Sequence, residues 1–143
     1  MDTVFFDMDG TLIDTEKYYN VCWCEAIAKF GYTITKEEAL DLRSLGRPHV
    51  YRFFEEKYGK GFPYEEMRAY RKKIMEEMLK RDGITVKPGA KEILLWLKSR
   101  QIRCMIATAT DLERTRQNRY LEMAGLSSYF DEIISAVMVK NGK

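Results

Sequence analysis

The feature that most constrains the fold is a long helical stretch between two short β-prone segments. Thr3–Phe6 is an apolar run near the N-terminus, and the segment from Ile102 to Ala107 (IRCMIA) is a second strand candidate. Between them, residues from about 15 to 82 repeat apolar side chains at helical spacing, and Gly31 and Gly59 end two of the runs. This order predicts an α/β core that is interrupted by an all-helical insertion.

The rest of the chain alternates between helix and strand patterns. The turn signal Pro88-Gly89 precedes an amphipathic run, and a third strand candidate extends from Glu132 to Ala136 (EIISA). Strands that alternate with helices are typical of parallel βαβ units. We therefore assign residues 1–14 and 83–143 to a discontinuous α/β core and residues 15–82 to an inserted helical domain.

Composition and charge exclude several classes of protein. Of the 143 residues, 45% are hydrophobic and 32% are charged, which is typical of a folded domain. The formal net charge is +2 and the basic residues are spread along the chain, so we expect no nucleic-acid partner. No apolar run approaches ~18 residues and the start lacks a signal-peptide pattern, so we expect no membrane segment and a cytoplasmic location.

Two further expectations concern burial. Thr3–Phe6 carries apolar residues on both parities, which predicts a strand that is buried on both faces of a parallel sheet. The basic run Arg71-Lys72-Lys73 lies in a helical pattern, and we expect it to form an ordinary solvated helix face.

Polar residues follow each of the first two strand candidates. Asp7 and Asp9 come after the first, and Thr108-Ala109-Thr110, with two hydroxyls, comes after the second, just before a helical pattern. Because ligands of open α/β sheets bind outside the carboxyl ends of the strands, we expect these residues to face one crevice. The Thr108 hydroxyl and the backbone N–H groups that follow it predict an anion site at a helix N-terminus.

Two acids beside an anion site require a cation between them. Mg²⁺ takes oxygen ligands and keeps substrate phosphate in its shell, so the pattern indicates metal-assisted phosphoryl transfer. One carboxylate can attack phosphorus, and the other can hold a proton for the leaving oxygen. Gly10 lets the backbone turn sharply and approach the ligand. The alternative for Asp7 and Asp9 is an ordinary surface turn, where acids and glycine are common.

These residues carry a resemblance to a known family. The stretch FDMDGTLIDTE, with Asp7 and Asp9, resembles motif I of the haloacid dehalogenase (HAD) superfamily, and MIATAT, with Thr108, resembles motif II. The stretches VKPGAKEILLWLKSRQIRCMIATAT and LEMAGLSSYFDEIISA are similar to the β-phosphoglucomutase-like phosphatase branch. The resemblance implies a HAD-like Rossmannoid parallel-sheet core, with residues 15–82 as the helical C1 cap of that branch.

The resemblance also implies roles for the two acids. Asp7 would be the nucleophile that forms an aspartyl-phosphate. Asp9 would be the general acid/base and would offer its backbone carbonyl to Mg²⁺, so that Asp7 and Asp9 together would bind the metal. The implied reaction is Mg²⁺-dependent hydrolysis of a small phosphate monoester, possibly a sugar phosphate.

The remaining implied roles concern the substrate. Lys143 would be the catalytic lysine of motif III, or alternatively an ordinary charge at the end of the chain. The full set of residues implied for substrate and phosphate is Gly10, Thr11, Thr108, Ala109, Lys143 and Arg47. Arg47 would read the substrate from a cap loop, but a helix-connecting turn with solvated arginines explains it at least as well.

The resemblance stops at motif III, so motif IV and its metal-binding acids are absent from the sequence. The fourth and fifth core strands of the family are absent with it, which would leave the first strand as an edge capable of self-association. Three alternatives to the phosphatase follow. They are a phosphomutase, a catalytically impaired fragment, and a 2-haloacid dehalogenase, which Asp9 disfavours because that branch usually lacks this acid. Tyr19 stands where β-phosphoglucomutases carry a His, which disfavours the mutase.

Overall fold

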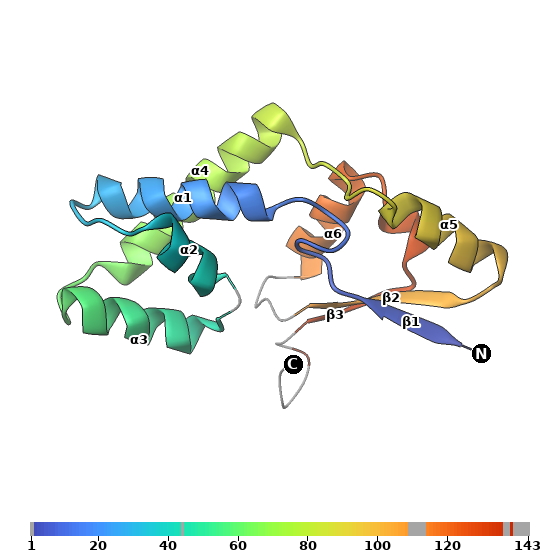
Figure 1. The fold of residues 1–143 in the computed structure, drawn as a ribbon, viewed down its shortest axis with the longest axis horizontal. Helices are drawn as coiled ribbons and strands as arrows, with labels where there is room; N and C mark the ends of the chain where they lie inside the picture. The colour runs from blue at the N-terminus through green and yellow to red at the C-terminus, as the bar shows by residue number, and fades with distance from the viewer. Residues whose placement is uncertain (1, 44, 109–113, 136–137, 139–143) are drawn as a thin grey trace. The chain divides into compact units, whose positions relative to one another are not determined.

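The computed structural model describes residues 2–43, 45–108, 114–135 and 138. The chain divides into two compact units (Figure 1). Unit 1 comprises Met1–Thr15 and Gly83–Lys143, and unit 2 comprises Glu16–Asp82. Unit 1 holds the sheet and unit 2 is entirely helical within the described residues.

Unit 1 is built on a parallel sheet with the strand order β1-β2-β3. The strands are β1 (Thr3–Phe6), β2 (Arg103–Thr108) and β3 (Glu132–Ser135). Phe6 pairs with Ile106, and Ile106 pairs with Ile133. The helices are α5 (Ala90–Ser99), α6 (Arg114–Met123) and the short 3-10 helix η1 (Ser127–Tyr129). The α/β fold predicted from the sequence is therefore confirmed.

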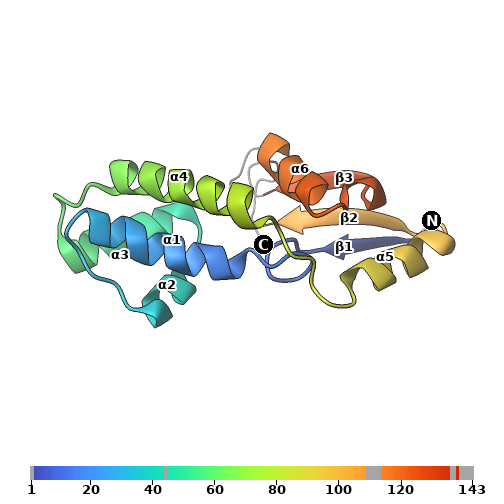
Figure 2. The ribbon, with the colours of Figure 1, turned by 90° about the horizontal axis from the view of Figure 1, so that it is seen from above.

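The core of unit 1 lies between the sheet and its helices. Figures 1 and 2 show α5 and α6 on the same face of the sheet, as expected when successive parallel strands are joined by right-handed crossovers. Leu94 and Leu97 of α5 are buried, and so are Ile106 and Ile133 of the sheet. These buried side chains form part of the core between α5 and the sheet.

One expectation for this sheet was wrong. Phe5, in the middle of β1, is 56% exposed, so β1 is not buried on both faces. The neighbouring Phe6 packs edge-to-face on Phe130 at 6.1 Å between ring centroids. Successive side chains of a strand alternate between faces, and α5 and α6 lie on one face only. Phe5 therefore remains accessible, as judged from the described residues.

The described residues of unit 2 form four helices. They are α1 (Glu16–Lys29), α2 (Lys36–Leu42), α3 (Arg47–Tyr58) and α4 (Tyr64–Asp82). The buried ring of Phe54 stacks on Phe62 at 4.9 Å and lies 5.4 Å from the Trp23 ring. This aromatic cluster supplies much of the apolar area that holds the bundle together.

The start of α2 is a capping box. The Glu38 amide donates to the Thr35 hydroxyl at 3.1 Å, and the Thr35 amide donates to a Glu38 carboxylate oxygen at 3.0 Å. Lys57 also donates to Glu38, and this hydrogen bond, with that from the Thr35 amide, holds the pKa of the Glu38 carboxyl below its usual value. The Thr35 and Glu38 side chains, spaced as in the S/T-x-x-E pattern, thus accept hydrogen bonds from two amides that would otherwise lack partners at the helix start.

Arg71 departs from the expectation of a solvated basic face. Its guanidinium lies 4.5 Å from the Trp23 ring centroid and 5.6 Å from the Tyr19 ring centroid. The Nε atom is buried, whereas Lys73 two residues later is exposed. The expectation was wrong for Arg71 because its planar guanidinium can stack on aromatic faces that a charge count does not reveal.

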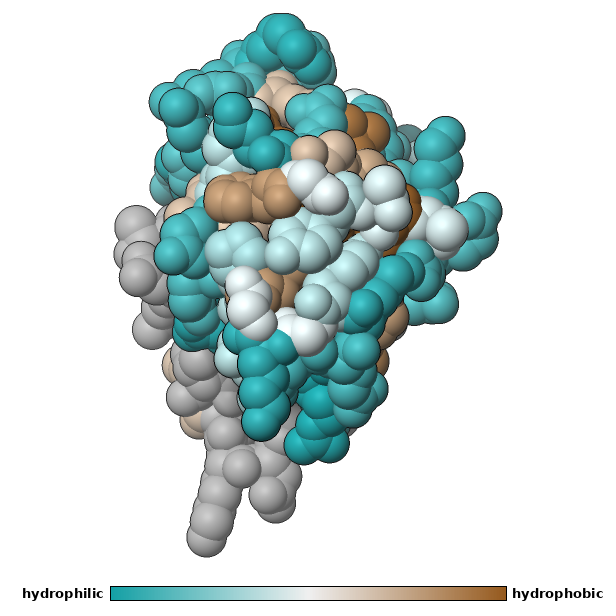
Figure 3. Space-filling view, turned by 90° about the vertical axis from the view of Figure 1, so that its left-hand side faces the viewer, coloured by the Kyte–Doolittle hydropathy of each residue, from teal (hydrophilic) through white to brown (hydrophobic). Residues whose placement is uncertain are grey.

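The surface mixes polar and apolar residues. Figure 3 shows one face of the molecule, on which apolar and weakly polar side chains form a central area bordered by hydrophilic ones. Among the described residues, no helix combines the length and the apolarity that crossing a bilayer would demand.

Adjacent leucines on α5 provide a test of this packing. Leu94 is fully buried, whereas Leu95 is 50% exposed. We expect Leu94→Ala to lower the free energy of unfolding by about 2–5 kcal/mol, because it leaves a cavity between α5 and the sheet. Leu95→Ala, the matched control, should cost less than about 1 kcal/mol. Urea unfolding measures both, and equal losses would contradict the assigned orientation of α5.

Candidate active site

The predicted site residues of the two strands lie at one edge of the sheet. Asp7 directly follows β1, and the buried Thr108 is the last residue of β2. The strands are parallel and Phe6 pairs with Ile106, so Asp7 and Thr108 both lie at the carboxyl ends of adjacent strands. This is the edge at which open α/β sheets bind their ligands.

A tight turn follows Asp7 and fixes the position of Asp9. The Met8 carbonyl accepts hydrogen bonds from the amides of Leu12 at 3.0 Å and Ile13 at 3.2 Å. Gly10 has a φ of 79° and donates its amide to the Ile13 carbonyl at 2.8 Å. Met8, Leu12 and Ile13 are buried, so the apolar residues of the motif anchor the turn that carries the acids. The glycine is needed because its φ lies in the left-handed region.

Asp9 is held by a residue that the sequence analysis missed. The Thr15 hydroxyl donates to Oδ1 of Asp9, and Thr15 is fully buried. The second carboxylate oxygen, Oδ2, is also buried from solvent. In the sequence, Thr15 stands directly before a helical pattern, and such a threonine predicts a helix cap and not a partner for an acid six residues earlier.

The chain segments that leave and re-enter unit 1 pair with each other. The Asp14 amide donates to the Thr85 carbonyl at 2.8 Å, and the Lys87 amide donates to the Leu12 carbonyl at 2.9 Å. Ile13 forms an antiparallel bridge with Val86. The Lys87 ammonium also lies 3.9 Å from Oδ1 of Asp14. These contacts fix the backbone between the turn and Thr15.

The donor chemistry of Asp7 and Asp9 suits Mg²⁺, which takes oxygen ligands and retains water or substrate phosphate. Within the ranges that the structure describes, no group of three or more His, Cys, Asp or Glu residues could hold a metal ion. Asp7 and Asp9 would therefore supply only part of an oxygen shell. The rest of the shell would come from substrate phosphate, water, or residues beyond those described.

The other predicted site residues lie in the turn after β1, outside the described residues, or in unit 2. Gly10 is half-buried and Thr11 is exposed in the turn. Ala109 and Lys143 lie outside the described residues. Arg47 belongs to unit 2, where its guanidinium forms an exposed ion pair with Glu65 at 2.6 Å. The role of Arg47 toward a substrate stays a prediction.

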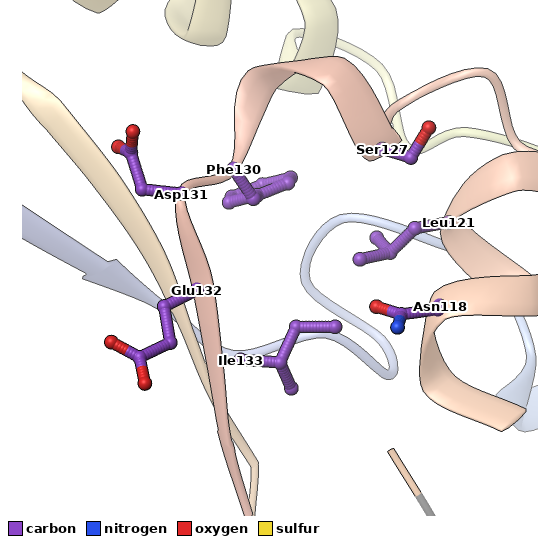
Figure 4. Close-up of a pocket in the computed structure, with 7 residues that line it drawn as sticks. All are labelled: Asn118, Leu121, Ser127, Phe130, Asp131, Glu132 and Ile133. Atoms are coloured by element: carbon purple, nitrogen blue, oxygen red, sulfur yellow. The ribbon is translucent and has the colours of Figure 1, made fainter. Parts of the chain in front are cut away.

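Unit 1 also contains a cavity, and neither Asp7 nor Asp9 lines it. It has a volume of about 230 Å³ and lies between α6, η1 and the start of β3. Figure 4 shows the side chains of Leu121, Phe130 and Ile133 around the space, with Asn118 and Ser127 at its side. Of the predicted site residues that the structure describes, none lines it. The cavity lies at the amino end of β3, whereas Thr108 lies at the carboxyl end of the parallel strand β2.

Comparison with known proteins decides the family. The family model described as "Haloacid dehalogenase-like hydrolase" matches residues 4–143. The chain belongs to this family. The matched range includes Asp7, Asp9 and Thr108, the residues at the carboxyl ends of β1 and β2.

The relatives include named phosphatases and sugar-phosphate enzymes. The chain is 30% identical over 149 residues to "Phosphorylated carbohydrates phosphatase" of Thermotoga maritima, covering 100% of this chain and 65% of the relative. It matches the crystal structure of beta-phosphoglucomutase from Clostridium difficile with 26% identity and a TM-score of 0.71, covering 100% of this chain and 66% of the other. CbbY from Rhodobacter sphaeroides, solved in complex with phosphate, shares the fold with a TM-score of 0.77 at 22% identity. The match covers 100% of this chain and 67% of CbbY.

The chain spans only part of the length of its curated relatives. The first three matches are covered over 65%, 61% and 51% of their lengths. The chain therefore corresponds to between about half and two thirds of each of these relatives.

The turn at Gly10 provides a test of the site's architecture. We expect Gly10→Ala to lower the free energy of unfolding by about 1–2 kcal/mol, because an L-residue is strained at a φ of 79°. Gly61→Ala is the matched control, since Gly61 lacks a positive φ and a Cβ there would meet nothing within 4 Å. Chemical unfolding of the two variants measures the difference. Equal stability would show that the turn does not need the left-handed conformation.

Proposed function

We propose that this chain is the catalytic part of a Mg²⁺-dependent phosphatase that acts on a small phosphate monoester through an aspartyl-phosphate. One observation carries the proposal. Asp7 follows β1 at the carboxyl edge of the sheet, with Thr108 at the end of the adjacent strand and Asp9 held two residues away. Membership of the HAD-like hydrolases supports the same chemistry.

The reaction would proceed in two balanced steps. An oxygen of the Asp7 carboxylate attacks phosphorus, the bond between phosphorus and the ester oxygen breaks, and the leaving oxygen takes the proton of the Asp9 carboxyl. Water then attacks the phosphorus of the aspartyl-phosphate and gives a proton to the Asp9 carboxylate. The bond between phosphorus and Asp7 breaks, which releases inorganic phosphate and restores both acids.

The remaining site residues would bind the phosphoryl group. The Thr108 hydroxyl, the Ala109 amide and the Lys143 ammonium would hold its oxygens, and the turn at Gly10 and Thr11 would bring backbone close to it. Mg²⁺, bound by the Asp7 carboxylate and the Asp9 backbone carbonyl, would neutralise charge between the acids and the phosphate.

The substrate class we propose is a phosphorylated carbohydrate or a similar small metabolite. The name of the Thermotoga maritima relative supports this class. Arg47 of unit 2, with its guanidinium on the exposed surface, would contact a polar or anionic group of the substrate. A cytoplasmic location stays a prediction from the sequence.

A phosphomutase is the second candidate, favoured by the 26% identity to beta-phosphoglucomutase. Tyr19, where that enzyme family carries a His, favours the phosphatase. Product analysis with a sugar phosphate separates the two candidates. A phosphatase releases inorganic phosphate, whereas a mutase returns an isomeric sugar phosphate.

Replacement of the nucleophile tests the proposal. We expect the whole protein that contains this chain to release phosphate from p-nitrophenyl phosphate only with Mg²⁺, and Asp7→Asn to lower the rate at least about 10³-fold. Asp2→Asn is the matched control, because Asp2 is an exposed acid just before β1, at the opposite end of the same strand. Its rate should equal that of the wild type.

Two outcomes would contradict the proposal. Phosphate release that survives Asp7→Asn would show that another group attacks phosphorus. A folded whole protein that releases no phosphate with Mg²⁺ would show that these residues do not form a working phosphatase site.

The outer edge of β1 supports a separate proposal about self-association. Among the described strands, β1 pairs only with β2, and its Phe5 is exposed. An apolar strand edge with unused backbone groups pairs readily with another chain. For the chain of residues 1–143 we expect a dimer or larger species in sedimentation velocity, reduced by Phe5→Lys. A monomer at all concentrations would contradict this.

A further inference from the structure

We propose that the outward face of α5 is a docking surface for a membrane that contains anionic lipids. The outward face is the side of α5 that points away from the sheet. It consists of Lys91, Ile93, Leu95, Trp96, Lys98 and Arg100. The inference goes beyond the proposed function, because none of these residues belongs to the phosphatase site.

The α5 helix exposes large apolar side chains that its packing on the sheet does not use. Leu94 and Leu97 are buried, whereas the adjacent Leu95 and Trp96 are 50% and 48% exposed. Ile93 is also exposed, three residues before Trp96. Figures 1 and 2 show no described helix or strand over this side of α5. A group of exposed apolar side chains of this kind marks an interaction surface.

The charges around these apolar side chains are nearly all positive. The segment from Lys91 to Arg103 holds four basic residues and one acid, namely Lys91, Lys98, Arg100, Arg103 and Glu92. This short segment thus carries a net charge of +3, more than the +2 of the whole chain. Among the described residues, none of the four cations forms an ion pair. Charge complementarity therefore indicates an anionic partner.

Two of the cations lie against aromatic rings. The Arg100 guanidinium lies 3.9 Å from the Trp96 ring centroid, and the Lys98 ammonium lies 5.4 Å from the Tyr129 ring centroid. Both charges remain on exposed side chains. Tryptophan beside lysine or arginine is typical of the headgroup level of a bilayer, where an apolar stem and a charged end both find suitable surroundings.

A lipid surface fits this face better than the groove of a partner protein. A helix that docks in a groove presents apolar anchors at positions i, i+3, i+4 and i+7. On α5 the row that contains Leu95 and Trp96 begins at Glu92 and ends at Ser99, so only its two middle positions are apolar. A second copy of the chain would bring like charges together, which is unfavourable.

Two apolar side chains surrounded by cations suit shallow insertion between anionic headgroups, where apolar burial and electrostatic attraction act together. The expectation of no membrane segment is unaffected, because a contact of this kind needs no spanning helix.

The fluorescence of Trp96 tests the contact directly, because the chain's other tryptophan, Trp23, is only 5% exposed. The whole protein that contains this chain is mixed with vesicles of phosphatidylserine and phosphatidylcholine, or of phosphatidylcholine alone. We expect a blue shift of the emission and quenching by lipids brominated in the acyl chain, only with phosphatidylserine. Trp96→Phe should abolish both signals, and added salt should weaken the binding.

Variants in cosedimentation with the phosphatidylserine vesicles separate charge from apolar contact. Lys98→Glu should weaken binding at least about 10-fold, whereas Arg52→Glu, an exposed arginine of α3, should bind as the wild type does. Leu95→Ala should weaken binding about 5-fold or more, and Leu40→Ala, an exposed leucine of α2, is its matched control. Unchanged circular dichroism checks that each variant is folded.

Four results would overturn the inference. The first is a folded wild type that does not bind the phosphatidylserine vesicles, and the second is equal binding to both kinds of vesicle. The third is wild-type binding by both Lys98→Glu and Leu95→Ala, which would place the contact elsewhere. The fourth is binding of soluble polyglutamate as tightly as of the vesicles, which would assign this face to an acidic protein partner.

Discussion

The parallel pairing of β1 with β2 is the constraint on which the rest of the site depends. The two strands come from opposite sides of the helical insertion, and only their pairing brings Asp7 and Thr108 to one edge. Beyond the strands, the two segments that flank the insertion also pair with each other, Leu12–Asp14 with Thr85–Lys87. An insertion of 67 residues can therefore leave and return without separating the acids from the end of β2.

Electrostatics then decides what this edge can do. Two carboxylates beside a phosphate site repel the substrate unless a cation or a proton intervenes. The proposed function uses both solutions, since Asp7 would share a metal with phosphate and Asp9 would carry a proton between the two steps. Their surroundings differ accordingly. Asp7 follows the strand directly, whereas Asp9 lies in a closed turn where its Oδ1 accepts a hydrogen bond from Thr15.

Much of this could be predicted from the sequence because short-range patterns dictate it. The parallel α/β core follows from alternating helices and strands, and the capping box at Thr35 follows from its spacing to Glu38. The Thr15 contact could not be predicted, because a hydrogen bond across a turn depends on how Gly10 and Ile13 close that turn. The exposure of Phe5 was missed because hydrophobicity alone does not tell which elements cover a face. The stacked position of Arg71 was missed for a related reason, since charge does not indicate what the side chain lies against.

The central claim is that the Asp7 carboxylate is the nucleophile and forms an aspartyl-phosphate intermediate. The most direct measurement is to mix the protein with Mg²⁺ and a phosphate monoester, quench it in acid within milliseconds, and map the phosphorylated peptide by mass spectrometry. The account predicts one phosphoryl group on the Asp7 carboxylate, absent from Asp7→Asn. A phosphoryl group on Asp9 or on any other residue, or turnover without a phosphorylated protein, would contradict it.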